Sequence, residues 1–196
     1  MPKNVNHEEK KDQIAEAAWR VILNHGMEGA SVRNIAVEAG ISVGALRHYF
    51  ATQDELLVYA MTLVTEKVKE RVEHIAALDL PPQEKVIKIL CEIVPLNKQT
   101  MTEMEVWFSF IIHLRHKGDR FALQSDGVLN GIRAVVEYLD ANRMLLPGLD
   151  QAVETERLYA LVDGIALHAM LEPQRLKREQ IVAVLTRHIQ SICKEA

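Results

Sequence analysis

The sequence predicts an all-α protein, and two observations carry this prediction. Apolar residues recur at spacings of three and four along most of the 196 residues, and no segment shows the apolar-polar alternation of a half-buried strand. Gly and Pro lie mainly between the periodic segments, where they end helices. We expect about nine helices, near residues 8–25, 32–39, 43–49, 53–77, 83–94, 100–116, 120–142, 152–171 and 177–194.

Local signals place the first four helices. The first has one apolar face, extended by Trp19, and Gly26 is placed to end it. That face consists of Ile14, Ala17, Ala18, Val21 and Ile22. Ser31 and Ser42 precede the next two segments as N-caps, and Gly40 provides the turn between them. Thr52 caps a long fourth helix, whose Asp54 and Glu55 suit the positive end of the helix dipole.

Proline and glycine separate the later helices. The breaks fall at Pro81-Pro82, Pro95, Gly118-Asp119, Pro147-Gly148 and Pro173. The ninth segment carries one apolar stripe, which indicates a helix packed on a core.

Composition narrows the class of protein. With 48% apolar residues, 26% charged residues and a net charge of -4, the chain is typical of a globular protein. It has no apolar segment long enough to cross a bilayer and no signal-peptide core, so we expect a cytoplasmic protein. Cys91 and Cys193 lie far apart, outside any zinc spacing. Because it also lacks a nucleophile elbow, a phosphate-binding glycine loop and an HExxH motif, we expect neither an enzyme nor a cofactor.

Residues 31–50, SVRNIAVEAGISVGALRHYF, have the pattern of a helix-turn-helix. The residues expected to turn inward are Ile35, Ala36, Ala39, Ile41, Leu46 and Phe50. Val43, Ala45, Arg47 and His48 then remain on the outer face of the third helix. Arg47 can pair with guanine edges or phosphate, and Val43 and Ala45 can meet thymine methyl groups. Ser31 and Arg33 suit a phosphate, and Ser42 is a further candidate DNA-binding residue. The alternative is that Arg47 and His48 are ordinary solvated side chains.

Residues 14–57 resemble the DNA-binding region of the TetR/AcrR family. The matching residues follow in order without gaps: Ala17-Ala18, Gly26, Ser31-Val32, Ile35-Ala36, Ala39-Gly40-Ile41-Ser42, Gly44, Leu46, Tyr49-Phe50 and Leu56-Leu57. The resemblance implies a DNA-binding domain at residues 1–51, whose third helix enters the major groove and whose Tyr49 contacts phosphate. It also implies a ligand-binding and dimerisation domain at residues 52–196, reached through the fourth helix.

Two positions depart from the family pattern. Gln53 stands where the family often has a phosphate-binding lysine, so an ionic contact is lost although a hydrogen bond can still form. Arg47 stands where an aromatic residue is common, which would alter base preference. Residues 1–60 carry six Lys or Arg against eight Asp or Glu, so we expect a monomer to have modest non-specific affinity for DNA.

The family resemblance further implies a repressor that a small ligand releases from a pseudo-palindromic operator. The sixth segment is rich in aromatic and Met residues, which suits an apolar pocket for an apolar or amphipathic ligand. The candidate ligand-binding residues are Met104, Trp107, Phe110, His113, Phe121 and Asn130, with Glu103 as a further polar group. For each of these residues, the alternative is ordinary core packing. For ligand sensing as a function, the alternative is a C-terminal domain that binds a protein partner or is purely structural. A metal held by His113 and His116 with Glu103 or Asp126 is disfavoured by their spacing.

The eighth segment is apolar around much of its circumference, and Ala160, Gly164 and Ala169 would let another helix approach closely. Related proteins form two-fold homodimers through their last two helices, which places two recognition helices on successive turns of DNA. The corresponding interface residues here are Leu161, Ile165, His168, Val184, Leu185, Ile189 and Ile192. Asp163 and His168 could instead form a buried polar pair within one subunit.

Overall fold

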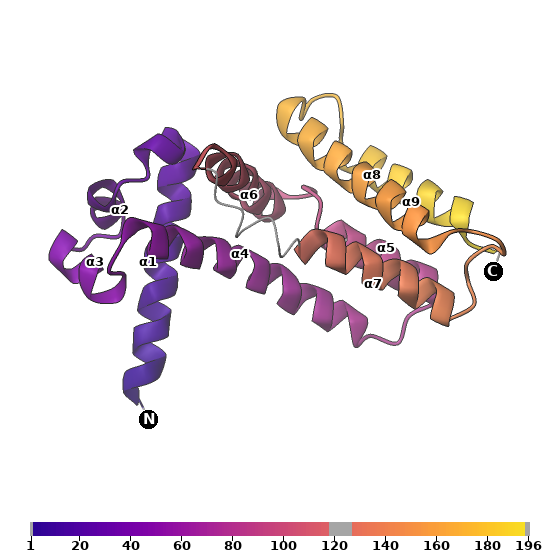
Figure 1. Ribbon diagram of the computed structural model, residues 1–196, viewed down its shortest axis with the longest axis horizontal. Coiled ribbons are helices and arrows are strands. Elements are labelled where there is room, and N and C mark those ends of the chain that lie inside the picture. The colour runs from indigo at the N-terminus through magenta and orange to yellow at the C-terminus, as the bar shows by residue number, and fades with distance from the viewer. Residues whose placement is uncertain (1, 118–126, 195–196) are drawn as a thin grey trace. The chain divides into compact units, whose positions relative to one another are not determined.

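The computed structural model describes residues 2–117 and 127–194, and within them all regular secondary structure is helical (Figure 1). The helices are α1 (Pro2–Gly29), α2 (Val32–Glu38), α3 (Val43–Tyr49), α4 (Gln53–Ala76), α5 (Pro82–Glu92), α6 (Lys98–Lys117), α7 (Gly127–Ala141), α8 (Gln151–Leu171) and α9 (Arg178–Ile192). The predicted fold class is confirmed for this part of the chain.

The helix boundaries agree with the predicted ones to within two residues, except at the first helix and at the start of the seventh. α1 begins at Pro2, earlier than the predicted residue 8, and continues to Gly29, past the predicted end at residue 25. Its regular geometry is interrupted at Gly26, whose φ of 67° is left-handed. The expected start of the seventh helix at residue 120 lies outside the described residues, and the described helix begins at Gly127.

The chain forms two compact units, which divide within α4 and again within α6. Residues 1–67 with 105–120 form the first unit, and residues 68–104 with 121–196 form the second. In the first unit, Trp19 is 7% exposed, and its indole Nε1 donates a hydrogen bond to the Ala60 carbonyl at 2.9 Å. This bond satisfies the polar atom of a buried ring and fastens α1 to α4.

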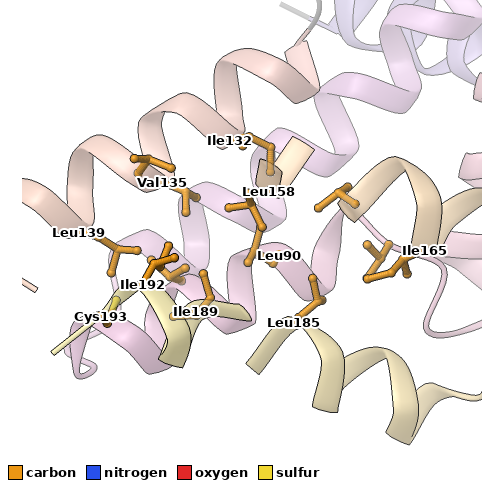
Figure 2. Close-up of a cluster of buried hydrophobic side chains, with 14 of the residues drawn as sticks. Leu90, Ile132, Val135, Leu139, Leu158, Ile165, Leu185, Ile189, Ile192 and Cys193 are labelled. Atoms are coloured by element: carbon orange, nitrogen blue, oxygen red, sulfur yellow. The ribbon is translucent and has the colours of Figure 1, made fainter. Parts of the chain in front are cut away.

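The core of the second unit is built by α5, α7, α8 and α9 (Figure 2). Leu90, Leu139, Leu158, Leu185 and Ile189 are completely buried there. Each such side chain contributes about 1.5–3 kcal/mol by leaving water. The end of the chain closes this core, because the Leu146 amide donates to the Ile192 carbonyl and the Lys194 amide to the Met144 carbonyl, at 2.9 and 2.7 Å.

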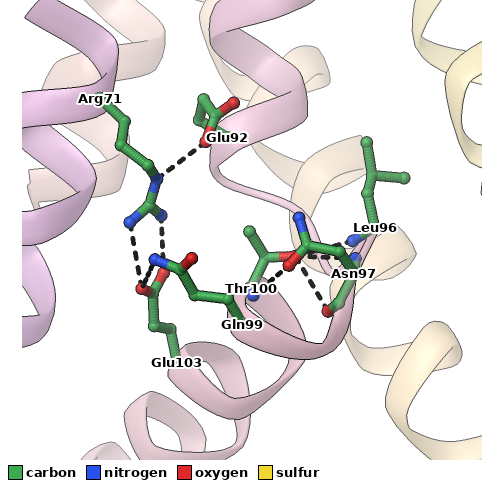
Figure 3. Close-up of polar contacts among 7 residues, drawn as sticks. All are labelled: Arg71, Glu92, Leu96, Asn97, Gln99, Thr100 and Glu103. Atoms are coloured by element: carbon green, nitrogen blue, oxygen red, sulfur yellow. Dashed lines mark hydrogen bonds and ion pairs between the residues drawn. The ribbon is translucent and has the colours of Figure 1, made fainter.

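A polar network fastens the last part of α4 to α5 and to the start of α6 (Figure 3). Arg71 donates from Nε to Glu92 at 2.8 Å, and from both terminal nitrogens to the two carboxylate oxygens of Glu103, at 3.1 and 2.7 Å. Glu103 also accepts from Gln99 at 3.0 Å. Because the Glu103 side chain is only 6% exposed, these bonds supply nearly all the compensation for its burial.

Candidate nucleic-acid interface

The helix-turn-helix is set by two serine caps and one glycine. The Ser31 hydroxyl accepts from the Asn34 amide at 3.2 Å and starts α2, and the Ser42 hydroxyl accepts from the Ala45 amide at 3.1 Å and starts α3. Both predicted caps are confirmed. Gly40 has a φ of 66°, which favours glycine.

The turn at Gly40 closes α2 in a Schellman motif. The Gly40 amide donates to the Val37 carbonyl at 3.1 Å, and the Ile41 amide donates to the Ala36 carbonyl at 3.0 Å. These two bonds satisfy carbonyls that the helix end would otherwise leave unpaired. The geometry fixes the direction in which α3 leaves α2, as the sequence predicts.

Burial divides the predicted inward and outward residues of the motif. Ile35, Ala36, Leu46 and Phe50 are at most 1% exposed, whereas Ala39 and Ile41 are partly exposed at the turn. On the outward side, the exposed predicted residues are Arg33, Ser42, Ala45, Arg47 and His48, and the half-buried ones are Ser31, Val43 and Tyr49. Of the predicted base-reading side chains, Ala45 and Arg47 are therefore exposed, whereas Val43 is only partly exposed.

Gln53 has a contact within the protein that the sequence did not indicate. Its Nε2 donates to the carbonyl of Ala30 at 3.0 Å, so α4 is fastened to the residue that follows α1. Thr52 caps α4 as expected, because its hydroxyl accepts from the Glu55 amide at 3.0 Å. The Glu55 carboxylate in turn accepts from the Ala51 amide at 2.8 Å.

The local charge of the motif is more favourable to DNA than its composition suggests. Glu38 is the one acidic residue among residues 31–50, and its carboxylate lies 2.5 Å from Nε of Arg20. Both side chains are substantially exposed, so the pair is screened by solvent and adds little stability. It nevertheless offsets the negative charge of Glu38, and Arg33 and Arg47 are the other charged residues of the segment.

Sequence reasoning missed a group of residues near the start of α1. The His7 ring stacks on Tyr49 with centroids 4.9 Å apart, and the Tyr59 hydroxyl donates to Asp12 at 2.7 Å. These contacts join residues more than forty positions apart, and the polar composition of residues 1–11 carries no periodic signal that would have indicated them.

The predicted ligand-binding residues are divided between the two units. Met104 and Asn130 belong to the second unit, and Trp107, Phe110 and His113 belong to the first. Phe110 is buried, and Met104, Trp107 and His113 are half-buried. Asn130 is exposed, and its side-chain oxygen accepts from Arg133 at 3.1 Å on the same helix. Phe121 lies outside the described residues, so the pocket stays a prediction.

The structure shows a groove at another place in the second unit. It has a volume of about 1000 Å³ and is lined by the end of α4, by α5 and by α9, with Ile75, Ile87, Cys91 and Val182 among its residues. Burial raises the pKa of the Cys91 thiol, which therefore stays protonated at neutral pH.

One of the ligands in the disfavoured metal hypothesis, Glu103, is engaged in another contact. The Glu103 carboxylate is held by Arg71, and the side chains of His116 and Asp126 lie outside those the structure describes. Within the described residues, no three His, Cys, Asp or Glu side chains gather in a way that could hold a metal ion.

The predicted dimer residues fall into two groups. Ile165, Leu185, Ile189 and Ile192 are at most 5% exposed within the single chain, so almost none of their side-chain surface is left for a partner. Leu161 is half-buried, and Val184 and His168 are exposed. The alternative prediction of a buried Asp163–His168 pair is wrong, because both side chains are exposed. The His168 Nδ1 lies 3.8 Å from the Glu172 carboxylate instead.

These features define a helix-turn-helix DNA-binding protein: a short capped helix, a glycine turn, and a second short helix whose polar side chains point outward. Family models agree with this class and refine it. The model of the TetR family of bacterial regulatory proteins matches residues 14–60, and that of the BetI-type transcriptional repressor C-terminal domain matches residues 82–194. The chain therefore belongs to the TetR family and is a helix-turn-helix transcriptional regulator rather than an enzyme.

Individual relatives match over nearly the whole chain. The sequence is 57% identical to the HTH-type transcriptional regulator PksA of Bacillus subtilis (strain 168), covering 100% of this chain and 95% of that protein. It is 24% identical to the regulator BetI of Yersinia pestis (strain Pestoides F), covering 97% and 96%.

Solved structures share the fold. A transcriptional regulator from Rhodococcus sp. Rha1 has a TM-score of 0.81 at 25% identity, covering 95% of this chain and 98% of that one. A regulator from Saccharomonospora viridis, crystallised in complex with choline, has a TM-score of 0.82 at 18% identity, covering 96% and 100%. As for membranes, none of the helices in the described part of the chain combines the length and apolar character needed to cross one.

Proposed function

We propose that the protein is a homodimeric repressor that binds a pseudo-palindromic operator through α3 and is released by a small molecule. The observation that carries the DNA contact is the division of α3 into a buried side at Leu46 and an exposed side at Ala45, Arg47 and His48. The matched C-terminal family is described as a repressor domain, which supports repression rather than activation.

In this proposal the outer residues have separate tasks. Arg47 donates to guanine or phosphate, and Val43 and Ala45 contact thymine methyl groups. Tyr49, Ser31 and Arg33 contact phosphates, which position the protein without reading sequence. Gln53 contributes its second amide hydrogen at most, because the other is donated to Ala30.

The DNA contacts are tested with Arg47→Ala and Tyr49→Ala. Each substitution should weaken binding to a DNA sequence enriched from a random library by about 1–3 kcal/mol, or roughly 5- to 150-fold. Arg133→Ala, which removes an exposed arginine from α7, is the matched control and should leave the affinity unchanged. Equal binding by wild type and both α3 variants would refute the placement of α3 on DNA.

An exposed apolar stripe on α8 supports the dimer. Val153, Ala160, Gly164, Leu167 and Leu171 fall on one side of the helix, since their spacings of seven, four, three and four residues keep one face. All but the half-buried Gly164 are exposed, and Leu171 is 67% exposed. Small residues within an apolar stripe let a second helix approach closely. Val184, a predicted interface residue on α9, is also exposed.

Leu167→Arg tests this interface. A charge buried between two subunits should disrupt the dimer, which sedimentation would detect as a shift to monomer. Ala134→Arg places the same charge at an exposed position of α7 and should leave the mass unchanged. If Leu167→Arg stays dimeric, the stripe is not the interface.

We propose a small apolar or amphipathic effector that contacts the aromatic segment of α6. Support comes from the half-buried Trp107 and from solved relatives that hold small molecules: choline in the Saccharomonospora viridis protein and imidazole in the multidrug binding protein EbrR. The effector should lower affinity for DNA and perturb Trp107 fluorescence, measured in Trp19→Phe so that Trp107 is the one emitting tryptophan. If apolar, quaternary ammonium and acyl compounds change neither signal, a C-terminal unit that binds a protein partner or is purely structural is favoured instead.

A further inference from the structure

α1 extends beyond the region that the family model covers. The model of the TetR DNA-binding region begins at residue 14, whereas α1 begins at Pro2. The side chains of residues 7–13 therefore lie outside the matched motif, and they belong to the same compact unit as α3.

His7, near the start of this extension, forms a three-ring cluster with the last residues of α3. Its ring stacks on Tyr49 with a centroid separation of 4.9 Å and an interplanar angle of 29°. His48 meets both rings edge-on, at 5.6 Å from Tyr49 and 6.3 Å from His7. These separations lie in the range where aromatic pairs attract one another.

The extension is held in place by contacts of Glu8, Lys11 and Asp12, which follow His7 within about one and a half helical turns. The Tyr59 hydroxyl donates to Asp12 at 2.7 Å and to Glu8 at 3.4 Å. Burial and the neighbouring Asp12 carboxylate raise the pKa of Tyr59, so this hydroxyl stays protonated and remains a donor. The Lys11 ammonium lies 5.6 and 5.1 Å from the ring centres of Phe50 and Tyr59. Two independent kinds of contact thus fix the position from which His7 reaches α3.

Tyr49 and His48 need such a support. They end a helix of seven residues, and neither is fully buried. A side chain that moves among rotamers in the free protein loses conformational entropy when DNA fixes it, and this loss weakens binding. A ring that already holds the side chain in place removes part of that loss.

We propose that His7 is a positioning residue for DNA recognition: its ring holds Tyr49 and His48 in the orientation from which they reach the operator. This inference rests on the proposed contact of α3 with DNA. It assigns a role to a residue outside the matched motif, and the role depends on the ring of His7 rather than on its charge.

The test compares His7→Ala, His7→Phe and the control His25→Ala on a DNA sequence enriched from a random library by the wild-type protein. His25 is an exposed histidine of the same helix, and 18 residues of helix separate it from His7 by about 27 Å. His7→Ala should weaken binding about 2- to 10-fold, as expected for one lost aromatic contact. His7→Phe should restore most of the affinity, and His25→Ala should have no effect.

A second arm places His7→Ala in a background that carries both Tyr49→Ala and His48→Ala. If His7 acts through these two side chains, most of its effect should disappear there. The inference is overturned if His7→Ala binds like wild type, if His7→Phe is as weak as His7→Ala, or if the effect persists without Tyr49 and His48. Failure of the wild type to enrich any sequence would instead refute the proposed function, and the role of His7 with it.

Discussion

Arg71→Met offers a direct measure of the network that fastens α4 to α5 and α6. The substitution removes two bonds to Glu103 and one to Glu92 while keeping much of the apolar length of the side chain. Glu103 would remain buried and would keep the hydrogen bond from Gln99, which Figure 3 also shows. Glu92 is 28% exposed, so water can replace its lost contact.

The expected magnitude follows from these exposures. Removing one partner of a fully buried ion pair costs about 3–5 kcal/mol. Because the Arg71 side chain is 25% exposed, solvent already screens part of the pair, and we expect a loss of about 2–4 kcal/mol. For a chain of this size each kcal/mol lowers the melting temperature by roughly 2–4 °C, so the variant should melt roughly 4–16 °C lower.

Thermal unfolding followed by circular dichroism measures this shift. Lys69→Met is the matched control, because Lys69 lies on the same helix in an exposed pair with Glu73 at 3.6 Å and should contribute less than about 0.5 kcal/mol. Arg71→Met combined with Glu103→Met should recover much of the loss, since the buried charge is then absent. If Arg71→Met melts no lower than Lys69→Met, or if the double variant recovers nothing, the assigned role of the network is refuted.

Two further predictions concern the second unit. Burial, and secondarily the positive charge of Arg157, lower the pKa of His188 from its ordinary value of 6.5, against the opposing influence of Glu154. The folded protein therefore binds this proton less readily than the unfolded chain, and stability is lost as pH falls below about 6.5. The melting temperature of His188→Leu, relative to that of wild type, should therefore be higher at pH 5.5 than at pH 7.5. If the difference between the two proteins is the same at both pH values, the prediction is contradicted. Arg143 follows α7 with a left-handed φ of 58°, so Arg143→Gly should be stabilising by about 0.5–1 kcal/mol, whereas Arg133→Gly within the helix should be destabilising by about 1 kcal/mol. A lower melting temperature for Arg143→Gly would show that its backbone is not strained.

The DNA-binding motif could be predicted closely because its signals are local. A serine cap acts on an amide three residues away, and a glycine turn needs a residue that tolerates positive φ at one position. Ser31, Gly40 and Ser42 therefore determine where α2 and α3 begin and how they are joined. Because Leu46 and Phe50 are apolar and turn toward the core, Arg47 and His48 are left on the outer side.

The orientation of α8 and α9 could not be predicted in the same way. α8 is apolar around much of its circumference, so its periodicity does not distinguish the core side from the exposed side. In the structure Ile165 and Leu185 face the core, while Leu167 and Leu171 are exposed. The choice depends on α5 and α7, which cover one side of each helix.

The sequence by itself determined the helices, their caps and turns, and the family pattern around residues 14–57, because each depends on residues within one or two helical turns. Tertiary structure alone decided which distant groups meet. The pairings of His7 with Tyr49, of Gln53 with Ala30 and of Arg71 with Glu103 join parts of the chain that are 23 to 42 residues apart. Such contacts form because packing brings the helices together, and no local spacing encodes them.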